Sequence, residues 1–398
     1  MFSGRRVQLS RSVSLLVQAA SGNARHALVT GERGIGKSSF SSQLQGIARG
    51  ESKFLDLVDA KPADFPYTLL TVEHIAQVGQ GPMELAAGLL KELDASKGLM
   101  RFARFNLDFK IDLGPLTTTV RQKDNDPQDA VSRFVEGVQQ VVDHMQGKVD
   151  GIVLVVDEID RIAAAKGVST FFKVATERLS SRGIENVSFL LVGLVGTLAD
   201  LRVEHESVAR VFKPEEVPLM TEGECRDVLE RALSKTAITI DDAAVALITS
   251  FAGGYPNSVH LIGEAAYDLV VADGSTVIDE GKARDAVDTV VRGAAREDYD
   301  PQYLKIKGRS RNIIRFIAAQ EERDVPSSLV FKHLGVKPTD VSNNFDRLLR
   351  LDVLVRVTPG VYRLREPLFR EYLRFLDAGG DEPAQRRPEA RSDKSGKS

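Results

Sequence analysis

The chain has 398 residues, of which 42% are hydrophobic and 27% charged, a composition typical of a globular protein with roughly two or three domains. No apolar run approaches the roughly 18 residues that a membrane span requires, and the N-terminus lacks the basic-then-apolar layout of a secretory signal. Because Cys225 is the single cysteine, no internal disulfide can form, and we expect a cytoplasmic protein.

Charge is distributed unevenly along the chain. Residues 301–376 contain 15 Lys and Arg against 8 Asp and Glu, a net charge of +7. The tail from residue 377 holds five of each sign and the whole chain carries −3, so residues 1–300 carry −10. This asymmetry predicts a basic C-terminal module that has a polyanion or an acidic protein as its partner.

The first predicted elements are a helix and a buried strand. Apolar residues recur at helical spacing between Val7 and Val17, and the turn at 21–23 ends this helix. The apolar residues 27–29 follow at once and predict a short strand.

A glycine-rich loop follows that strand and fits the phosphate-binding pattern G-x-x-x-x-G-K-[ST]. Its residues are Gly31, Glu32, Arg33, Gly34, Ile35, Gly36, Lys37, Ser38 and Ser39. The glycines allow backbone N–H groups to approach phosphate oxygens at a helix N-terminus. Lys37 could then reach the β- and γ-phosphates of ATP, and the Ser38 hydroxyl could ligate Mg²⁺. A chance glycine-rich turn is disfavoured, because a strand precedes the loop and a helix-compatible run, 40–47, follows it.

Further strands and helices alternate up to residue 150. Residues 68–72 predict a second buried strand, and 83–93 and 130–145 predict helices. Alternating apolar residues within 99–127 suggest a strand pair inserted between those helices.

A second informative stretch runs from Gly151 to Asp160. Residues 152–156 are all β-branched or leucine, as in a strand buried on both faces of a parallel sheet, and Asp157 and Glu158 end it. Asp157 would hold Mg²⁺, and Glu158 would orient and deprotonate the attacking water. The alternative is an acidic helix N-cap after a buried strand.

The remaining elements complete an α/β domain and a helical segment. A helix at 168–179 and a strand at 187–192 continue the alternation, which predicts a parallel sheet sandwiched by helices. Arg210 precedes an apolar stretch at 212–217. Residues 241–272 predict two helices, and the turn between them either brings a helix N-terminus to a nucleotide or simply connects the helices.

The C-terminal module reads as a winged helix-turn-helix. Three helices, near 313–317, 327–334 and 340–351, precede a β-hairpin at 353–364. The third helix and the wing would present polar and basic side chains that can contact phosphates and base edges. These are Lys337, Thr339, Ser342, Asn343, Asn344, Arg347, Arg350, Arg356, Arg363 and Arg365. Winged helices also dock proteins, so the sequence leaves two functions open for this module, DNA contact and protein docking.

With these motifs in place, the chain resembles the AAA+/STAND group of P-loop ATPases, in particular origin-recognition-like and prokaryotic signalling ATPases that end in a winged helix. The resemblance rests on the opening 2–5, the phosphate loop, the strand end 155–160 and the Gly254-Tyr255-Pro256 turn. It spans residues 1–376 and implies a P-loop ATPase domain at 1–220, a helical lid at 221–300 and a winged helix at 301–376. After Asp377 the chain loses its apolar residues, which predicts a disordered tail at 377–398.

The resemblance also implies where ATP and Mg²⁺ would bind. They would lie between the sheet domain and the lid, with Pro256 near the nucleotide, and Arg210 would act across a subunit interface. The chain departs from the group at two places. Thr197 is the nearest candidate for the polar sensor that usually follows the fourth strand, and Asn257 stands where replication initiators have an arginine.

We therefore expect an ATP-dependent switch that hydrolyses slowly until it forms a homo-oligomer and that contacts duplex DNA through residues 301–376. Two alternatives stay open, a signalling or scaffold ATPase whose winged helix docks a protein, and a nucleotide-binding protein with negligible hydrolysis. A metabolic kinase is disfavoured, because residues 301–376 add a module with no visible pocket for an acceptor substrate.

Overall fold

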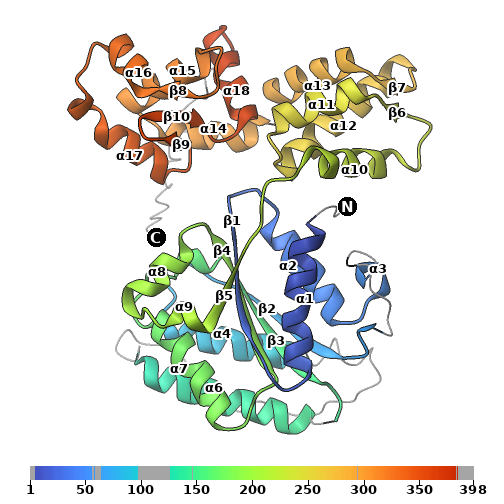
Figure 1. The fold of residues 1–398 in the computed structure, drawn as a ribbon, viewed down its shortest axis with the longest axis vertical. Coiled ribbons are helices and arrows are strands. Elements are labelled where there is room, and N and C mark those ends of the chain that lie inside the picture. Colours follow the sequence, from blue (N-terminus) through green and yellow to red (C-terminus); the bar gives the residue numbers. More distant parts are fainter. Residues whose placement is uncertain are drawn as a thin grey trace, which may run out of the picture. The chain divides into compact units, whose positions relative to one another are not determined.

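The computed structural model describes residues 5–55, 58, 64–96, 126–145, 147–293, 295–381 and 383. The chain divides into two compact units, Phe2–Leu219 and Met220–Ser398, which are considered separately below (Figure 1). The strand pair expected at 99–127 and most of the tail lie outside the described residues. Within the described ranges, no helix is long and apolar enough to cross a membrane.

A five-stranded parallel sheet forms the centre of the first unit. Its strands are β1 (His26–Gly31), β2 (Leu69–Ile75), β3 (Gly151–Asp157), β4 (Val187–Leu194) and β5 (Phe212–Glu216), in the order β2-β3-β4-β1-β5. Every residue of β3 is buried, because this strand lies inside the sheet and is covered on both faces.

Helices cover both faces of the sheet (Figure 1). One face is covered by α1 (Arg6–Ala20) and α2 (Lys37–Ala48), and on the other α4 (Pro82–Ala95), α6 (Pro127–Met145) and α7 (Val168–Ser181) pack against one another. The short elements are α3 (Ser52–Leu55), η5 (Ile159–Arg161), α8 (Thr197–Glu204) and α9 (Val208–Val211). The predicted α/β P-loop fold, with a parallel sheet between helices, is confirmed.

The second unit begins with a group of helices. They are α10 (Glu222–Leu233), α11 (Asp242–Ala252), α12 (Pro256–Asp273), α13 (Glu280–Arg292) and α14 (Ala295–Lys305), with a small parallel pair, β6 (Thr239–Ile240) and β7 (Val277–Ile278). Gly253 ends α11 with a φ of 61°, and Pro256 is the first residue of α12. The two helices predicted around this turn are therefore present.

The unit continues with a mixed segment that contains the three predicted helices and the hairpin. Its elements are α15 (Arg309–Ala319), β8 (Val325–Pro326), α16 (Ser327–Leu334), η6 (Pro338–Asp340), α17 (Ser342–Arg350), β9 (Leu354–Thr358), β10 (Val361–Leu364) and α18 (Pro367–Asp377). The strands pair antiparallel in the order β8-β10-β9. Lys337 and Thr339 precede α17 and do not lie on it, because the chain forms the separate turn η6 at Pro338.

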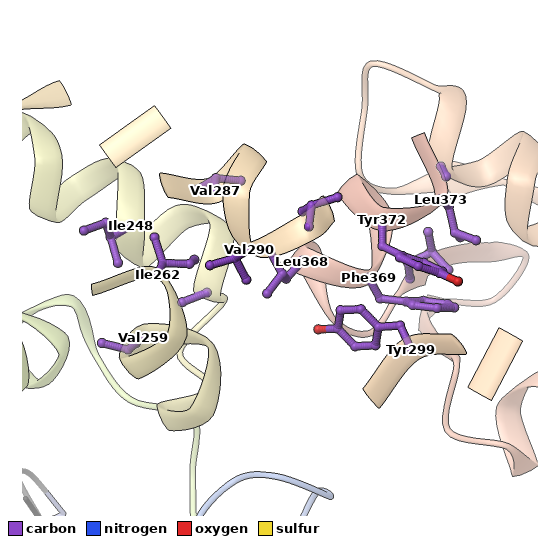
Figure 2. Close-up of a cluster of buried hydrophobic side chains, with 14 of the residues drawn as sticks. Ile248, Val259, Ile262, Val287, Val290, Tyr299, Leu368, Phe369, Tyr372 and Leu373 are labelled. Atoms are coloured by element: carbon purple, nitrogen blue, oxygen red, sulfur yellow. The ribbon is translucent and has the colours of Figure 1, made fainter. Parts of the chain in front are cut away.

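One hydrophobic core extends through the second unit, from Met220 to Leu376. Helix α18 packs against α11, α13, α14 and α15 (Figure 2). The Tyr299 ring of α14 lies 5.1 Å from the Phe369 ring of α18, between centroids, and the Tyr372 hydroxyl donates to Asp300 at 2.6 Å. The last helix therefore joins the helical group and the mixed segment into one packed body.

Candidate nucleotide site

The phosphate loop joins the carboxyl end of β1 to the N-terminus of α2. Gly34 and Gly36 have φ angles of 75° and 87°, in the left-handed region that favours glycine. A Cβ added to Gly31 would lie 2.8 Å from Cγ2 of Ile35 and 3.2 Å from the carbonyl oxygen of Val217. The loop thus has a tight form that depends on its glycines, and it presents α2 with its N-terminus toward the loop.

The polar side chains of the loop differ in exposure. Lys37 donates from Nζ to the carbonyl oxygen of Glu32 at 2.8 Å, so its ammonium group is folded onto the loop. Ser38 and Ser39 are exposed in the first turn of α2. Binding of a triphosphate would exchange the carbonyl partner of Lys37 for phosphate oxygens, which carry full charge.

Arg5 reaches the same loop from the start of the chain. It is 3% exposed, has a φ of 56°, and donates from Nη2 to the carbonyl oxygen of Ile35 at 2.5 Å. Arg5 belongs to the opening 2–5 on which the resemblance to AAA+/STAND ATPases rests, and that resemblance implies no role for it. Its contact joins residues 30 positions apart, which no local pattern predicts.

The acidic pair lies at the carboxyl end of β3. Asp157 is buried, and its Oδ1 accepts the N–H of Glu158 at 2.7 Å. Glu158 has a left-handed φ of 56°, and its Oε2 forms an ion pair with Nη2 of Arg161 at 2.6 Å. Both partners are about 40% exposed, so solvent screens this pair.

The phosphate loop and the acidic pair share one edge of the sheet. Strand β4 separates β1 from β3, all three are parallel, and Gly31 lies opposite Leu194 at the end of β4. Asp160 accepts the N–H of Leu194 at 3.1 Å, which ties the acidic segment to the end of β4. Thr197, the sensor candidate, is 1% exposed and donates its hydroxyl to the carbonyl of Leu194 at 2.7 Å.

The donor set at this edge fits a metal that arrives with a phosphate ligand. In the described part of the chain, no group of three or more His, Cys, Asp and Glu side chains could hold a metal ion. Mg²⁺ in phosphate sites uses one or two protein ligands and takes the rest from phosphates and water. The exposed Ser38 hydroxyl and the Asp157 carboxylate are suited to those two positions.

Arg210 lies near the amino ends of the strands, opposite the end that carries the phosphate loop. It sits in α9 directly before β5, and the first residue of β5, Phe212, pairs with His26 at the start of β1. The phosphate loop begins at the other end of β1, five residues or roughly 17 Å away along the strand. The guanidinium is exposed. If Arg210 takes part in hydrolysis, it would therefore act on the nucleotide of a neighbouring subunit. This role stays a prediction.

Pro256 belongs to the second unit. It is half-buried at the start of α12, after the buried Tyr255, and Gly254 accepts the N–H of Met220 at 3.0 Å. The neighbouring Asn257 donates to Asp298 at 3.4 Å. The expected contact between Pro256 and a nucleotide stays a prediction.

A cavity of about 510 Å³ lies elsewhere in the first unit. Residues at the starts of β3 and β4 line it, among them Asp150, Ile152 and Asn186. Because all strands are parallel, this cavity lies at the sheet edge opposite the phosphate loop, and no residue of the loop lines it. It is therefore separate from the candidate nucleotide site.

Comparison with known proteins agrees with the P-loop ATPase fold. Residues 2–179 match the family model described as an AAA ATPase domain. No curated protein matches the chain. Among solved structures, the ORC2 protein of Aeropyrum pernix in ADPNP and ADP complexes is similar, with 15% identity, a TM-score of 0.60, and coverage of 94% of this chain and 92% of that one.

A second similar structure is a Walker-type ATPase of Pyrococcus abyssi. It has 14% identity and a TM-score of 0.61, with 94% of this chain and 96% of that chain covered. At such identities the structures show similarity of fold alone. The family match supports ATP binding and ATP hydrolysis in general terms.

Proposed function

We propose that this chain is an ATP-hydrolysing switch of the AAA+/STAND type whose nucleotide state controls DNA contact by a C-terminal winged helix. The observation that carries the proposal is the shared sheet edge, where the phosphate loop and the acidic end of β3 lie on either side of β4. Lys37 would bind the β- and γ-phosphates, Ser38 and Asp157 would hold Mg²⁺, and Glu158 would take the proton of the attacking water.

Two features support slow turnover by an isolated subunit. The Glu158 carboxylate is held in an ion pair with Arg161, and this pair would have to open before the carboxylate could reach an attacking water. Arg210 is at the wrong edge of the sheet to reach its own phosphate loop. A homo-oligomer that brings Arg210 to the next subunit's nucleotide would supply the missing positive charge.

The mixed segment from Arg309 to Asp377 supports the winged-helix part of the proposal. Helices α15, α16 and α17 precede the β9–β10 hairpin, and β8 completes a three-stranded sheet. On α17, Phe345 and Leu348 are buried while Asn343 and Arg350 are exposed. The exposed face of α17 is therefore polar and basic, as a helix that enters the major groove requires.

The arginines of the hairpin are less available than those of α17. Arg365 forms an ion pair with Asp352 at 2.7 Å, and Arg363 lies 3.7 Å from Asp324. Arg356 is exposed and lies over the Tyr362 ring, 5.6 Å from its centroid. Two of the three wing arginines therefore already face carboxylates, which leaves less positive charge for DNA phosphates. This observation favours the second candidate function, in which the winged helix docks a protein.

DNA affinity in two nucleotide states tests the switch. Glu158→Gln should bind ATP without hydrolysing it, so that the protein stays in its ATP state. We expect this variant to bind a mixed-sequence DNA duplex with a different affinity in ATP than in ADP, by about tenfold or about 1.4 kcal/mol. Fluorescence anisotropy at fixed salt measures both affinities. Equal affinities in the two nucleotides would contradict nucleotide control of DNA contact.

A further inference from the structure

A basic segment next to α17 runs from the last residue of α14 to the first residue of α15. It comprises Lys305, Lys307 and Arg309, which are all exposed, and it is called the 305–309 strip below. Ile306 is fully buried and anchors the segment in the core, while the charged residues on either side of it are exposed. From residue 301 to 311 the sequence contains four cationic residues and no carboxylate.

Three polar contacts connect the strip and the adjacent Ser310 with α17 and with the turn η6 that precedes it. Arg347 of α17 donates from Nη2 to the carbonyl of Lys305 at 3.1 Å, and Arg309 donates to the carbonyl of Asp340 at 3.4 Å. Asn344 donates from Nδ2 to the Ser310 hydroxyl at 2.9 Å. The backbone of the strip is thus held beside α17, and the two form one joint surface.

The same segment concentrates positive charge where a helix does not favour it. Helix α15 begins at Arg309, has Arg309 and Arg311 in its first turn, and has no acidic residue there. The N-terminus of a helix carries partial positive charge, so cations at this position are unfavourable unless an anion offsets them. Asp340 and Asp346, the carboxylates of η6 and α17, are outnumbered by the cations of the joint surface. Arg311 is offset within the protein, because it donates to the carbonyl oxygens of Ile306 and Tyr303 and lies over the Tyr303 ring. The cations of the strip are exposed, and an anionic partner would offset their charge.

We propose that the 305–309 strip binds the phosphate backbone of duplex DNA beside the segment that α17 contacts. The proposal rests on the proposed function, because it takes α17 as the helix that faces DNA. It assigns the strip to positioning, since lysine and arginine contacts to phosphates carry no base sequence. A basic strip beside a polar helix is complementary in charge to an anionic duplex that lies across both.

The salt dependence of DNA binding tests the strip. The variant Lys305→Gln/Lys307→Gln/Arg309→Gln removes three charges from exposed side chains. Each phosphate contact contributes about 0.9 to the slope of log affinity against log salt, so we expect the slope to fall by about 2 to 3. The loss should be the same for duplexes of unrelated sequence. Anisotropy with two mixed-sequence duplexes over a salt series measures this.

A matched control separates local contacts from net charge. The variant Arg231→Gln/Lys235→Gln/Arg284→Gln removes three charges from α10, the residues after it and α13, and we expect it to keep the wild-type slope. If both variants lowered the slope equally, the effect would be one of net charge and the strip would not be a contact. A thermal melt checks that both variants fold.

The outcomes also separate this inference from the proposed function. Wild-type protein that binds duplex DNA with a steep salt slope, together with a strip variant that keeps that slope, would overturn the strip while the DNA proposal stands. Wild-type protein without salt-dependent DNA binding would overturn both. It would then favour the protein-docking candidate.

Discussion

At the scale of single residues, His26 is half-buried at the start of β1 and accepts a hydrogen bond. Its Nδ1 accepts the N–H of Phe189 at 3.1 Å, and its ring lies 5.7 Å from those of Phe189 and Phe212. Burial, followed by the positive charge of Arg25, lowers the pKa of His26 from 6.5 to about 4. The folded protein therefore keeps a neutral imidazole in a range where the unfolded chain would protonate it.

This shift predicts that the first unit loses stability in mild acid. Because the unfolded chain binds a proton at higher pH than the folded one, the stabilisation is complete above pH 6.5 and is lost as the pH falls toward 4. The whole loss should be about 3 kcal/mol. Urea unfolding at several pH values, followed by hydrogen exchange of β1 and β4 peptides, measures it. The variant His26→Asn keeps an acceptor without titrating, and an unchanged pH slope in that variant would contradict the assignment.

The residues of the nucleotide site differ in how far the sequence could predict them. The motif and its flanking apolar runs predicted a strand, a glycine-rich loop and a helix around Gly31 to Ser39. The structure has this order, with Gly31 at the end of β1 and Lys37 at the start of α2. The contacts of Arg5 with Ile35 and of Glu158 with Arg161 depend on side-chain conformation and on distant backbone. No sequence pattern encodes those contacts.

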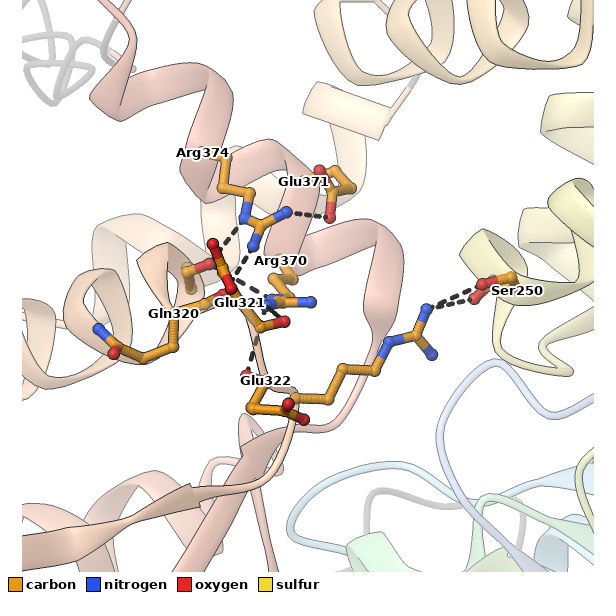
Figure 3. A network of polar contacts seen from close by, with 9 residues as sticks. Ser250, Gln320, Glu321, Glu322, Arg370, Glu371 and Arg374 are labelled. Atoms are coloured by element: carbon orange, nitrogen blue, oxygen red, sulfur yellow. Dashed lines mark hydrogen bonds and ion pairs between the residues drawn. The ribbon is translucent and has the colours of Figure 1, made fainter. Parts of the chain in front are cut away.

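At the scale of elements, the end of α15 is stabilised by arginines from α18 (Figure 3). Arg370 donates to the carbonyl oxygens of Ala318, Gln320, Glu321 and Glu322, and Arg374 donates to those of Ala318 and Gln320, both at 2.7 Å. These carbonyls have no partners within the helix, so cations here satisfy acceptors and face the negative end of the helix dipole. In the following loop, Arg323 donates to the Ser250 hydroxyl of α11 at 2.9 Å.

Removing the buried arginine should loosen the second unit. Arg370→Met leaves several carbonyl oxygens with fewer donors, and we expect a loss of about 2 to 3 kcal/mol of unfolding free energy. Arg370→Lys should recover only part of this loss, since an ammonium group lacks the planar fork of donors. Urea unfolding followed by hydrogen exchange of α15 and α18 peptides measures both variants. Wild-type stability in Arg370→Met would show that the network contributes nothing.

Helix α18 was not predicted from the sequence, although signals for it exist. Pro367 stands at its first position, and its buried residues Leu368, Phe369, Tyr372, Leu373 and Leu376 recur at helical spacing. The winged-helix pattern predicted from the sequence ends with the preceding hairpin, so that pattern includes no helix after it. What the sequence could not indicate is that α18 packs against α11 and α13, because that depends on tertiary contacts alone.

At the scale of the whole molecule, the sequence predicted the α/β sheet domain well, because buried parallel strands have a continuous apolar pattern. The strand order could not be read from the chain, since β1 pairs with β4 and β5 through contacts distant in sequence. The charge asymmetry was visible in composition. The placement of basic residues 305–309 beside α17 required the structure.

The most direct test of the proposed function is phosphate release from ATP by wild type and by Glu158→Gln, with and without duplex DNA. We predict slow release by wild type, faster release with DNA, and a loss of at least about a hundredfold in the variant, which should still bind ATP. Release by Glu158→Gln at the wild-type rate would contradict its role as the base. Wild-type release that is indifferent to DNA would contradict a DNA-coupled switch.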